Sequence, residues 1–207
     1  MKKDTKSLVL LGVLTAIEVI LIMTPIGSVA LPGGLKVTLA MIPVGIAALA
    51  LGPIGGLFIG AVWGIASFLG CLGIGVSSGL LVATFAINPL LTFLLCLVPR
   101  ALDGLLLGFI CRGCSKLMPV YPAYAVTGLC AALLNTIMFL SLLCLFFGNS
   151  EPVQNLMTKF NVSGYLALMI AIAGINAVCE MIASTVFVGA IGIALHRAKL
   201  VSQPAAA

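Results

Sequence analysis

Hydrophobic residues follow one another along this chain in blocks too long for the surface of a soluble protein. No residue between Val37 and Pro99 is charged. An uninterrupted apolar stretch of about 20 residues is the length of a helix that crosses a membrane. The pattern predicts an all-α integral membrane protein with six transmembrane helices, over residues 8–23, 37–51, 54–70, 85–110, 123–147 and 164–195.

The breaks between the apolar blocks are short, so a single membrane domain over residues 1–207 is expected. Gly52-Pro53 leaves room only for a tight turn between the second and third helices. Residues 24–36 (TPIGSVALPGGLK) contain two prolines and three glycines, which argue against a helix there. Residues 148–163 form the longest polar segment.

Charge is scarce and unevenly distributed. Hydrophobic residues make up 62% of the chain and charged residues 7%, with a net charge of +5. In a six-helix arrangement only Lys36 and Lys159 fall on one side, and seven cations fall on the other: Lys2, Lys3, Lys6, Arg112, Lys116, Arg197 and Lys199. Cytoplasmic loops carry the excess of lysine and arginine, so both termini are predicted to be cytoplasmic. This explanation makes a nucleic-acid partner unnecessary.

The first apolar block has an alternative reading as a signal peptide, because Ser28-Val29-Ala30 has the small residues of a cleavage site. Glu18 lies in the middle of that block, and the corresponding region of signal peptides is normally uncharged. A retained first helix is therefore the preferred interpretation.

The phosphate-binding loop and the common metal-binding motifs are missing from the sequence. There is no phosphate-binding G-x-x-x-x-G-K-[ST] loop, so any ATP must be used by another chain, and no cofactor is expected here. The single histidine, His196, lies at the predicted cytoplasmic end of the last helix, and no H-E-x-x-H motif occurs, which argues against an enzyme. Cys111 and Cys114 have C-x-x-C spacing without a second pair, so no metal site is predicted.

Few polar residues lie within the apolar blocks, and these are the candidates for binding a ligand. They are Glu18, Asn88, Arg100, Asp103, Asn135, Asn176 and Glu180. A pocket between the last three helices would gather Asn135, Asn176 and Glu180, and such a mostly apolar cavity with a few polar groups suits a small ligand. The alternative for each asparagine is a hydrogen bond between helices.

Arg100 and Asp103 are three residues apart, so the two can pair on one face of a helix. Charged residues within a membrane commonly mark a functional site. The alternatives are that the pair only neutralises itself, or that Arg100 extends toward the membrane surface.

Taken together, these segments resemble the substrate-binding (S) components of energy-coupling factor (ECF) vitamin transporters. The resemblance rests on residues 24–67, with I-P, L-G-P and G-x-x-x-G in order, and on VPRALDGLLLGFI, AALLNTIMFL and NAVCE further along. It covers nearly the whole chain, although each motif is loose alone.

The resemblance implies a six-helix protein of the bacterial plasma membrane that captures a vitamin from outside. It further implies two kinds of partner, a transmembrane coupling subunit and two ATPase subunits. The family's first helix docks on the coupling subunit through A-x-x-x-A, for which this chain has Gly12 and Ala16. The first loop closes over the ligand in this family, which would place residues near Gly33–Lys36 at the lid.

Within the family, the T-P-I-G, P-R-x-x-x-G and L-N-T segments look most like the pantothenate branch. Pantothenate carries a carboxylate, for which Lys36 or Arg100 would be the cation. An arginine can bind both oxygens of a carboxylate in a bidentate manner. Asn88, Asn135, Asn176 and Glu180 complete the expected substrate site. Folate, riboflavin and pyridoxine remain alternative substrates.

Two other classes of function stay open on the sequence alone. A stand-alone secondary transporter would need a titratable group on its path, and Glu180 or Glu18 is available. In a small structural membrane protein, the buried polar groups would only fix helix packing.

Overall fold

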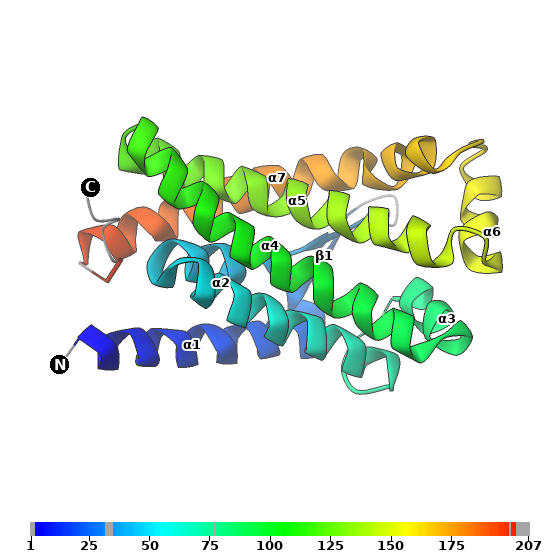
Figure 1. Ribbon diagram of the computed structural model, residues 1–207, viewed down its shortest axis with the longest axis horizontal. Helices are drawn as coiled ribbons and strands as arrows, with labels where there is room; N and C mark the ends of the chain where they lie inside the picture. The colour runs from blue at the N-terminus through cyan, green and yellow to red at the C-terminus, as the bar shows by residue number, and fades with distance from the viewer. Residues whose placement is uncertain (1–2, 32–34, 77, 199, 202–207) are drawn as a thin grey trace.

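The computed structural model describes residues 3–31, 35–76, 78–198 and 200–201; within these, the side chains of residues 3–4, 29–31, 35–37 and 175–176 are outside the description. The elements in chain order are α1 (Lys3–Met23), a 3-10 turn η1 (Pro25–Gly27), β1 (Ser28–Leu31), β2 (Leu35–Thr38), α2 (Met41–Cys71), α3 (Gly79–Ile87), α4 (Pro89–Leu117), α5 (Val120–Phe147), α6 (Glu151–Lys159) and α7 (Tyr165–Arg197) (Figure 1).

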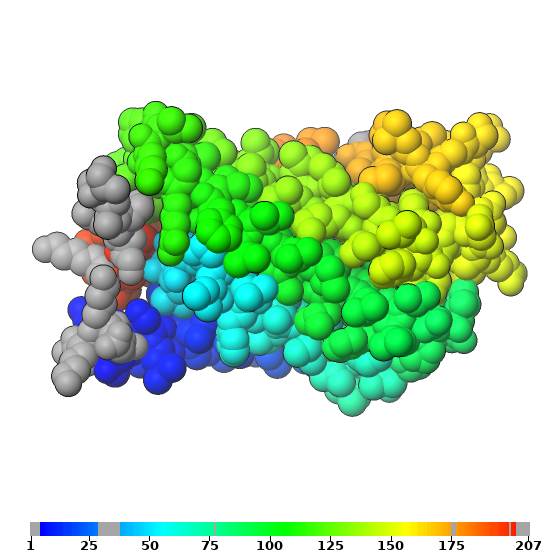
Figure 2. Space-filling model, viewed as in Figure 1, coloured from blue at the N-terminus to red at the C-terminus, as the bar shows by residue number. Residues whose placement is uncertain are grey.

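The long helices run side by side along the long axis of the molecule (Figure 1). In the described part of the chain, five helices are long and apolar enough to cross a membrane: α1, α2, α4, α5 and residues Ala177–Arg197 of α7. Side chains of α1, α2, α4 and α5 form a continuous surface on the face shown in Figure 2. The prediction of a helical membrane protein is therefore confirmed, although six separate spanning helices are not.

The difference in number arises at α2, which folds back on itself at Gly52. This residue has φ 78° and ψ −168°, a backbone conformation open to glycine and strained for other residues. A Cβ atom on Gly56 would lie 3.1 Å from the Cβ atom of Ala48, eight residues earlier, whereas a straight helix separates such positions by about 12 Å. The predicted turn at Gly52-Pro53 is thus present, with one limb on either side of it.

Glycines let the second limb of α2 approach α4 closely. A Cβ atom on Gly56 would collide with the backbone carbonyl of Gly104, and one on Gly60 would collide with the carbonyl of Arg100. Small residues allow such backbone contact between membrane helices. This contact places Arg100 of α4 beside the second limb of α2, the limb that also carries Trp63.

Several predicted boundaries differ from the observed ones. The helix predicted from residue 37 begins at Met41, because Leu35–Thr38 forms β2, which pairs antiparallel with β1. The helix predicted over 85–110 is α4, which extends to Leu117 and is separated from α3 at Asn88. The helix predicted over 164–195 has non-helical backbone at Gly174, and α6 lies within the polar segment 148–163.

The two ends of the molecule differ. The start of α1, the end of α7 and the connection between α4 and α5 lie together at one end, whereas α3 and α6 lie at the other (Figure 1). The first end carries Arg112, Lys116 and Arg197. This grouping matches the uneven charge distribution of the sequence.

Candidate functional site

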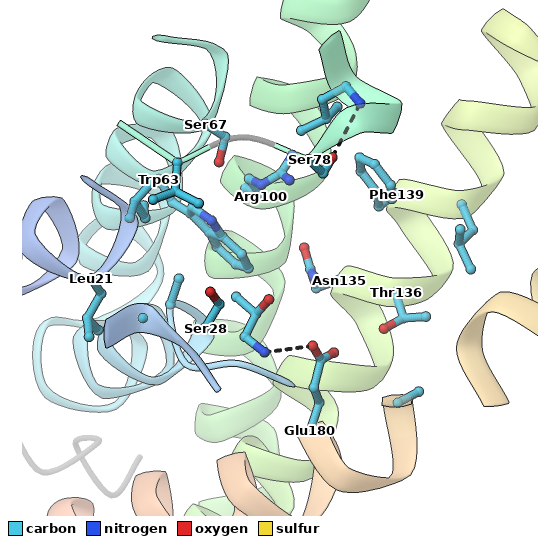
Figure 3. A pocket seen from close by; sticks show the side chains of 18 of the residues that line it. Leu21, Ser28, Trp63, Ser67, Ser78, Arg100, Asn135, Thr136, Phe139 and Glu180 are labelled. Atoms are coloured by element: carbon cyan, nitrogen blue, oxygen red, sulfur yellow. Dashed lines mark hydrogen bonds between the residues drawn. The ribbon is translucent and has the colours of Figure 1, made fainter. Parts of the chain in front are cut away.

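A cavity of about 390 Å³ lies among α1, α2, α4, α5 and α7, and the start of β1 and the end of β2 form part of its wall (Figure 3). It occupies the half of the molecule nearer α3, because the ends of α1 and α2 and the start of α3 line it. The polar side chains that line it come from eight different elements or connections: Thr24, Ser28, Thr38, Ser67, Ser78, Arg100, Asn135, Thr136 and Glu180.

Arg100 is the cation of this cavity. Its guanidinium carbon lies 5.1 Å from the ring centroid of Trp63 and 5.2 Å from that of Phe139, so the group lies between two aromatic faces (Figure 3). Nη1 donates hydrogen bonds to the carbonyl oxygens of Leu95 at 3.3 Å and Cys96 at 2.8 Å. The side chain is only 8% exposed. Arg100 therefore does not extend toward the membrane surface.

The expected pair between Arg100 and Asp103 is not formed. Both carboxylate oxygens of Asp103 are buried without a hydrogen-bond partner among the described residues, and the same holds for Glu18 on α1. Within the described chain, the hydrogen bonds of Arg100 go to backbone carbonyls. Its positive charge is thus not cancelled by a direct partner and is available to an anionic ligand.

Asn135 and Thr136 bring polar groups from α5 into the cavity, in the same stretch of helix as Phe139 (Figure 3). The side-chain oxygen of Asn135 is buried and has no hydrogen-bond partner among the described residues. A buried acceptor without a partner is costly, so a ligand donor that meets it contributes to binding.

Glu180 also lines the cavity, but its Oε1 atom is used within the protein. It accepts a hydrogen bond of 2.9 Å from the backbone N–H of Thr38, at the end of β2 (Figure 3). The structure therefore joins α7 to the wall formed by the strands.

The remaining predicted residues are placed differently or fall outside the description. Asn88 does not line the cavity; its Oδ1 atom accepts the N–H of Leu91 at 3.1 Å and caps α4. Lys36 pairs with Ala30 in the strands, but its side chain is outside the described residues, as is that of Asn176. Gly33 lies outside the described chain altogether.

Sequence reasoning missed the aromatic residues that surround Arg100. Trp63 is the single tryptophan of the chain, which was a usable signal, whereas Phe139 lies in an apolar stretch with nothing to distinguish it. Ser67 and Ser78 line the cavity as well, and short hydroxyl side chains are common in membrane helices without a binding role.

Gly12 and Ala16 lie on the exposed face of α1. Leu14 and Glu18, two positions after each of them and hence about 200° around the helix, are buried against the rest of the protein. A Cβ atom on Gly12 would meet nothing within 4 Å. These two small residues therefore point directly away from the core.

This arrangement suits the binding of a small polar anion. It combines a buried guanidinium, two aromatic faces, an unpaired amide oxygen and several hydroxyl groups in a largely apolar cavity. Among the described residues, no group of three or more His, Cys, Asp and Glu side chains is placed to hold a metal ion.

Comparison with known proteins gives the family. Residues 6–192 match the family model described as "ECF transporter, substrate-specific component". A search of curated protein sequences finds no match. Because the family match covers nearly the whole chain, this protein belongs to the substrate-specific components of ECF transporters, which bind the substrate of a transporter and are not enzymes.

Proposed function

We propose that this protein binds pantothenate with high affinity for an ECF importer, capturing the vitamin from outside the cell. The observation that carries the proposal is Arg100, held between Trp63 and Phe139 in the wall of the cavity. A guanidinium between aromatic faces is well suited to a carboxylate, because its planar fork can bind both oxygens.

The rest of pantothenate matches the other cavity groups. Its amide N–H and two hydroxyl groups are donors for Asn135 and for hydroxyl side chains such as those of Ser67 and Thr136. The cavity volume of about 390 Å³ is near the lower end of the roughly 300–1,000 Å³ of small-molecule sites. A short, flexible vitamin is therefore favoured over folate, which is much longer.

Transport requires partners in this proposal. A transmembrane coupling subunit and two ATPase subunits supply the motor, and the exposed face of α1 with Gly12 and Ala16 docks on the coupling subunit. The end that carries Arg112, Lys116 and Arg197 lies in the cytoplasm, in accordance with the positive-inside rule. The cavity then lies toward the outer surface, and the two limbs of α2 each count as a membrane crossing.

Calorimetric titration of the purified protein with pantothenate and with panthenol tests the proposal. Panthenol has an alcohol in place of the carboxylate and is otherwise the same molecule. Pantothenate is expected to bind about 100-fold more tightly, because a buried charge that loses its partner costs at least a few kcal/mol.

Riboflavin, pyridoxine and folate serve as the comparison set in the same titration. Equal binding of pantothenate and panthenol would contradict the role of the carboxylate. Preferential binding of one of the other vitamins would contradict the choice of substrate while leaving the family unchanged.

A further inference from the structure

One hydrogen bond joins two parts of the chain that are far apart in sequence and meet at the cavity. The backbone N–H of Thr38 donates to Oε1 of Glu180, 142 residues away, at 2.9 Å. Both residues line the cavity, and Figure 3 shows the bond beside Ser28. We use "β ribbon" for the two paired strands Ser28–Leu31 and Leu35–Thr38.

The direction of the Thr38 N–H follows from the geometry of the β ribbon. Ser28 pairs with Thr38, and the next N–H along, that of Leu39, donates to the carbonyl of Gly27 at 2.9 Å. Successive N–H groups of a strand point to opposite sides. The N–H of Thr38 therefore points away from β1, toward α7, and would be an unpaired edge donor without Glu180.

This hydrogen bond attaches the β ribbon to α7 at one defined point. Glu180 is 7% exposed, so its carboxylate meets Thr38 in a setting with little water. A hydrogen bond to a carboxylate is stronger than one to a neutral acceptor.

We propose that Glu180 is a positioning residue that holds the base of the β ribbon against α7, and that this attachment slows the escape of ligand from the cavity. The proposal assigns Glu180 to the wall of the site rather than to direct recognition of the ligand. Its second half rests on the proposed function, whereas the attachment itself does not.

Hydrogen–deuterium exchange of the ligand-free, full-length protein tests the attachment. In Glu180→Leu, peptides that contain Thr38 are expected to exchange about tenfold faster than in the wild type, because an edge donor loses its acceptor. Glu180→Gln keeps an acceptor oxygen and is expected to stay within about threefold of the wild type. Thr38→Pro removes the donor while leaving α7 unchanged, and is expected to accelerate exchange of the ribbon as Glu180→Leu does.

Ser184→Ala is the matched control. Ser184 lies one turn further along α7, and its hydroxyl donates to the carbonyl of Gly128 at 2.7 Å, away from the β ribbon. This variant also loses a buried hydrogen bond of α7, but exchange of the ribbon is expected to match the wild type. Wild-type exchange of the ribbon in Glu180→Leu and Thr38→Pro would overturn the proposal, as would equal acceleration in the control.

The release of labelled pantothenate tests the second half. From preloaded protein, dissociation is expected to be about tenfold faster in Glu180→Leu, with little change in the association rate. If dissociation accelerates while exchange of the ribbon is unchanged, Glu180 contacts the ligand directly and the proposal is overturned. If the wild type binds no pantothenate but the ribbon loosens as expected, the attachment stands and the proposed function fails.

Discussion

At the scale of single residues, Arg100 has the most distinctive surroundings in the cavity. Its Nη1 atom is occupied by the carbonyls of Leu95 and Cys96, and Trp63 and Phe139 cover its two faces. The guanidinium is thereby held in one orientation before a ligand arrives. A group that is already ordered loses little further freedom on binding, which favours high affinity.

Substitution of Arg100 is expected to remove the preference for a carboxylate. Arg100→Met should weaken pantothenate binding by about 100-fold and leave panthenol binding within a few fold, so that the two ligands bind alike. Arg100→Lys keeps the positive charge but loses the planar guanidinium and its contacts with the aromatic rings. Its preference for pantothenate over panthenol should therefore lie between those of the wild type and Arg100→Met. Calorimetric titration of both ligands measures this preference.

The matched control for Arg100 is Lys159→Met, which removes an equal charge from the exposed surface of α6. It should leave both affinities unchanged. A preference for pantothenate that survives in Arg100→Met would show that another group binds the carboxylate.

The sequence pointed to residues of the cavity wall only where a polar residue interrupts an apolar stretch. Arg100, Asn135 and Glu180 stand out for that reason, and all three line the cavity. Asn88 stood out equally, but Asn88-Pro89 is also the pattern of a helix cap followed by proline in the first turn, and this is its observed role. The packing of Trp63 and Phe139 against Arg100 could not be predicted from the sequence, because it depends on contacts between different helices.

At the scale of elements, α1 presents an apolar surface to its surroundings. Val9 and Val13 are 53% and 50% exposed, and they lie on the same side of the helix as Gly12 and Ala16. Small residues on such a surface allow another helix to approach the backbone closely. This geometry supports docking of the coupling subunit on α1.

Gly12→Leu with Ala16→Leu is expected to abolish co-purification with the coupling subunit and the ATPases, because the added side chains separate the two helices. Pantothenate binding should be unchanged, since neither residue lines the cavity. Pull-down of the complex, followed by titration of the isolated protein, measures both. Ala190→Leu, on an exposed position of α7, is the control. Normal complex formation by the double variant would argue against docking through this face.

Elements were predictable from the sequence when they were long and marked by strong breaks. The Gly52-Pro53 turn was correctly placed because the break separates two apolar stretches. The β ribbon was missed, since each of its strands has only four residues. The break at Gly174 was missed too, because an isolated glycine is common in membrane helices and its φ of 29° depends on tertiary context.

At the scale of the whole molecule, the cavity and the exposed face of α1 that carries Gly12 and Ala16 are separate. The cavity lies within the half nearer α3 and is lined by the ends of α1 and α2, the base of the β ribbon and the middle of α4, α5 and α7. The small residues of α1 lie outside, on a face that the rest of the described chain leaves uncovered. A ligand in the cavity would therefore leave the exposed face of α1 free for the coupling subunit that we propose to dock there.

The most direct test of the proposed function is native mass spectrometry of the purified protein after incubation with an equimolar mixture of pantothenate, folate, riboflavin and pyridoxine. The cavity chemistry predicts one bound molecule with the mass of pantothenate, and loss of that species in Arg100→Met. A complex with the mass of a different vitamin, or a protein that remains free of all four, would contradict the proposal that this S-component captures pantothenate.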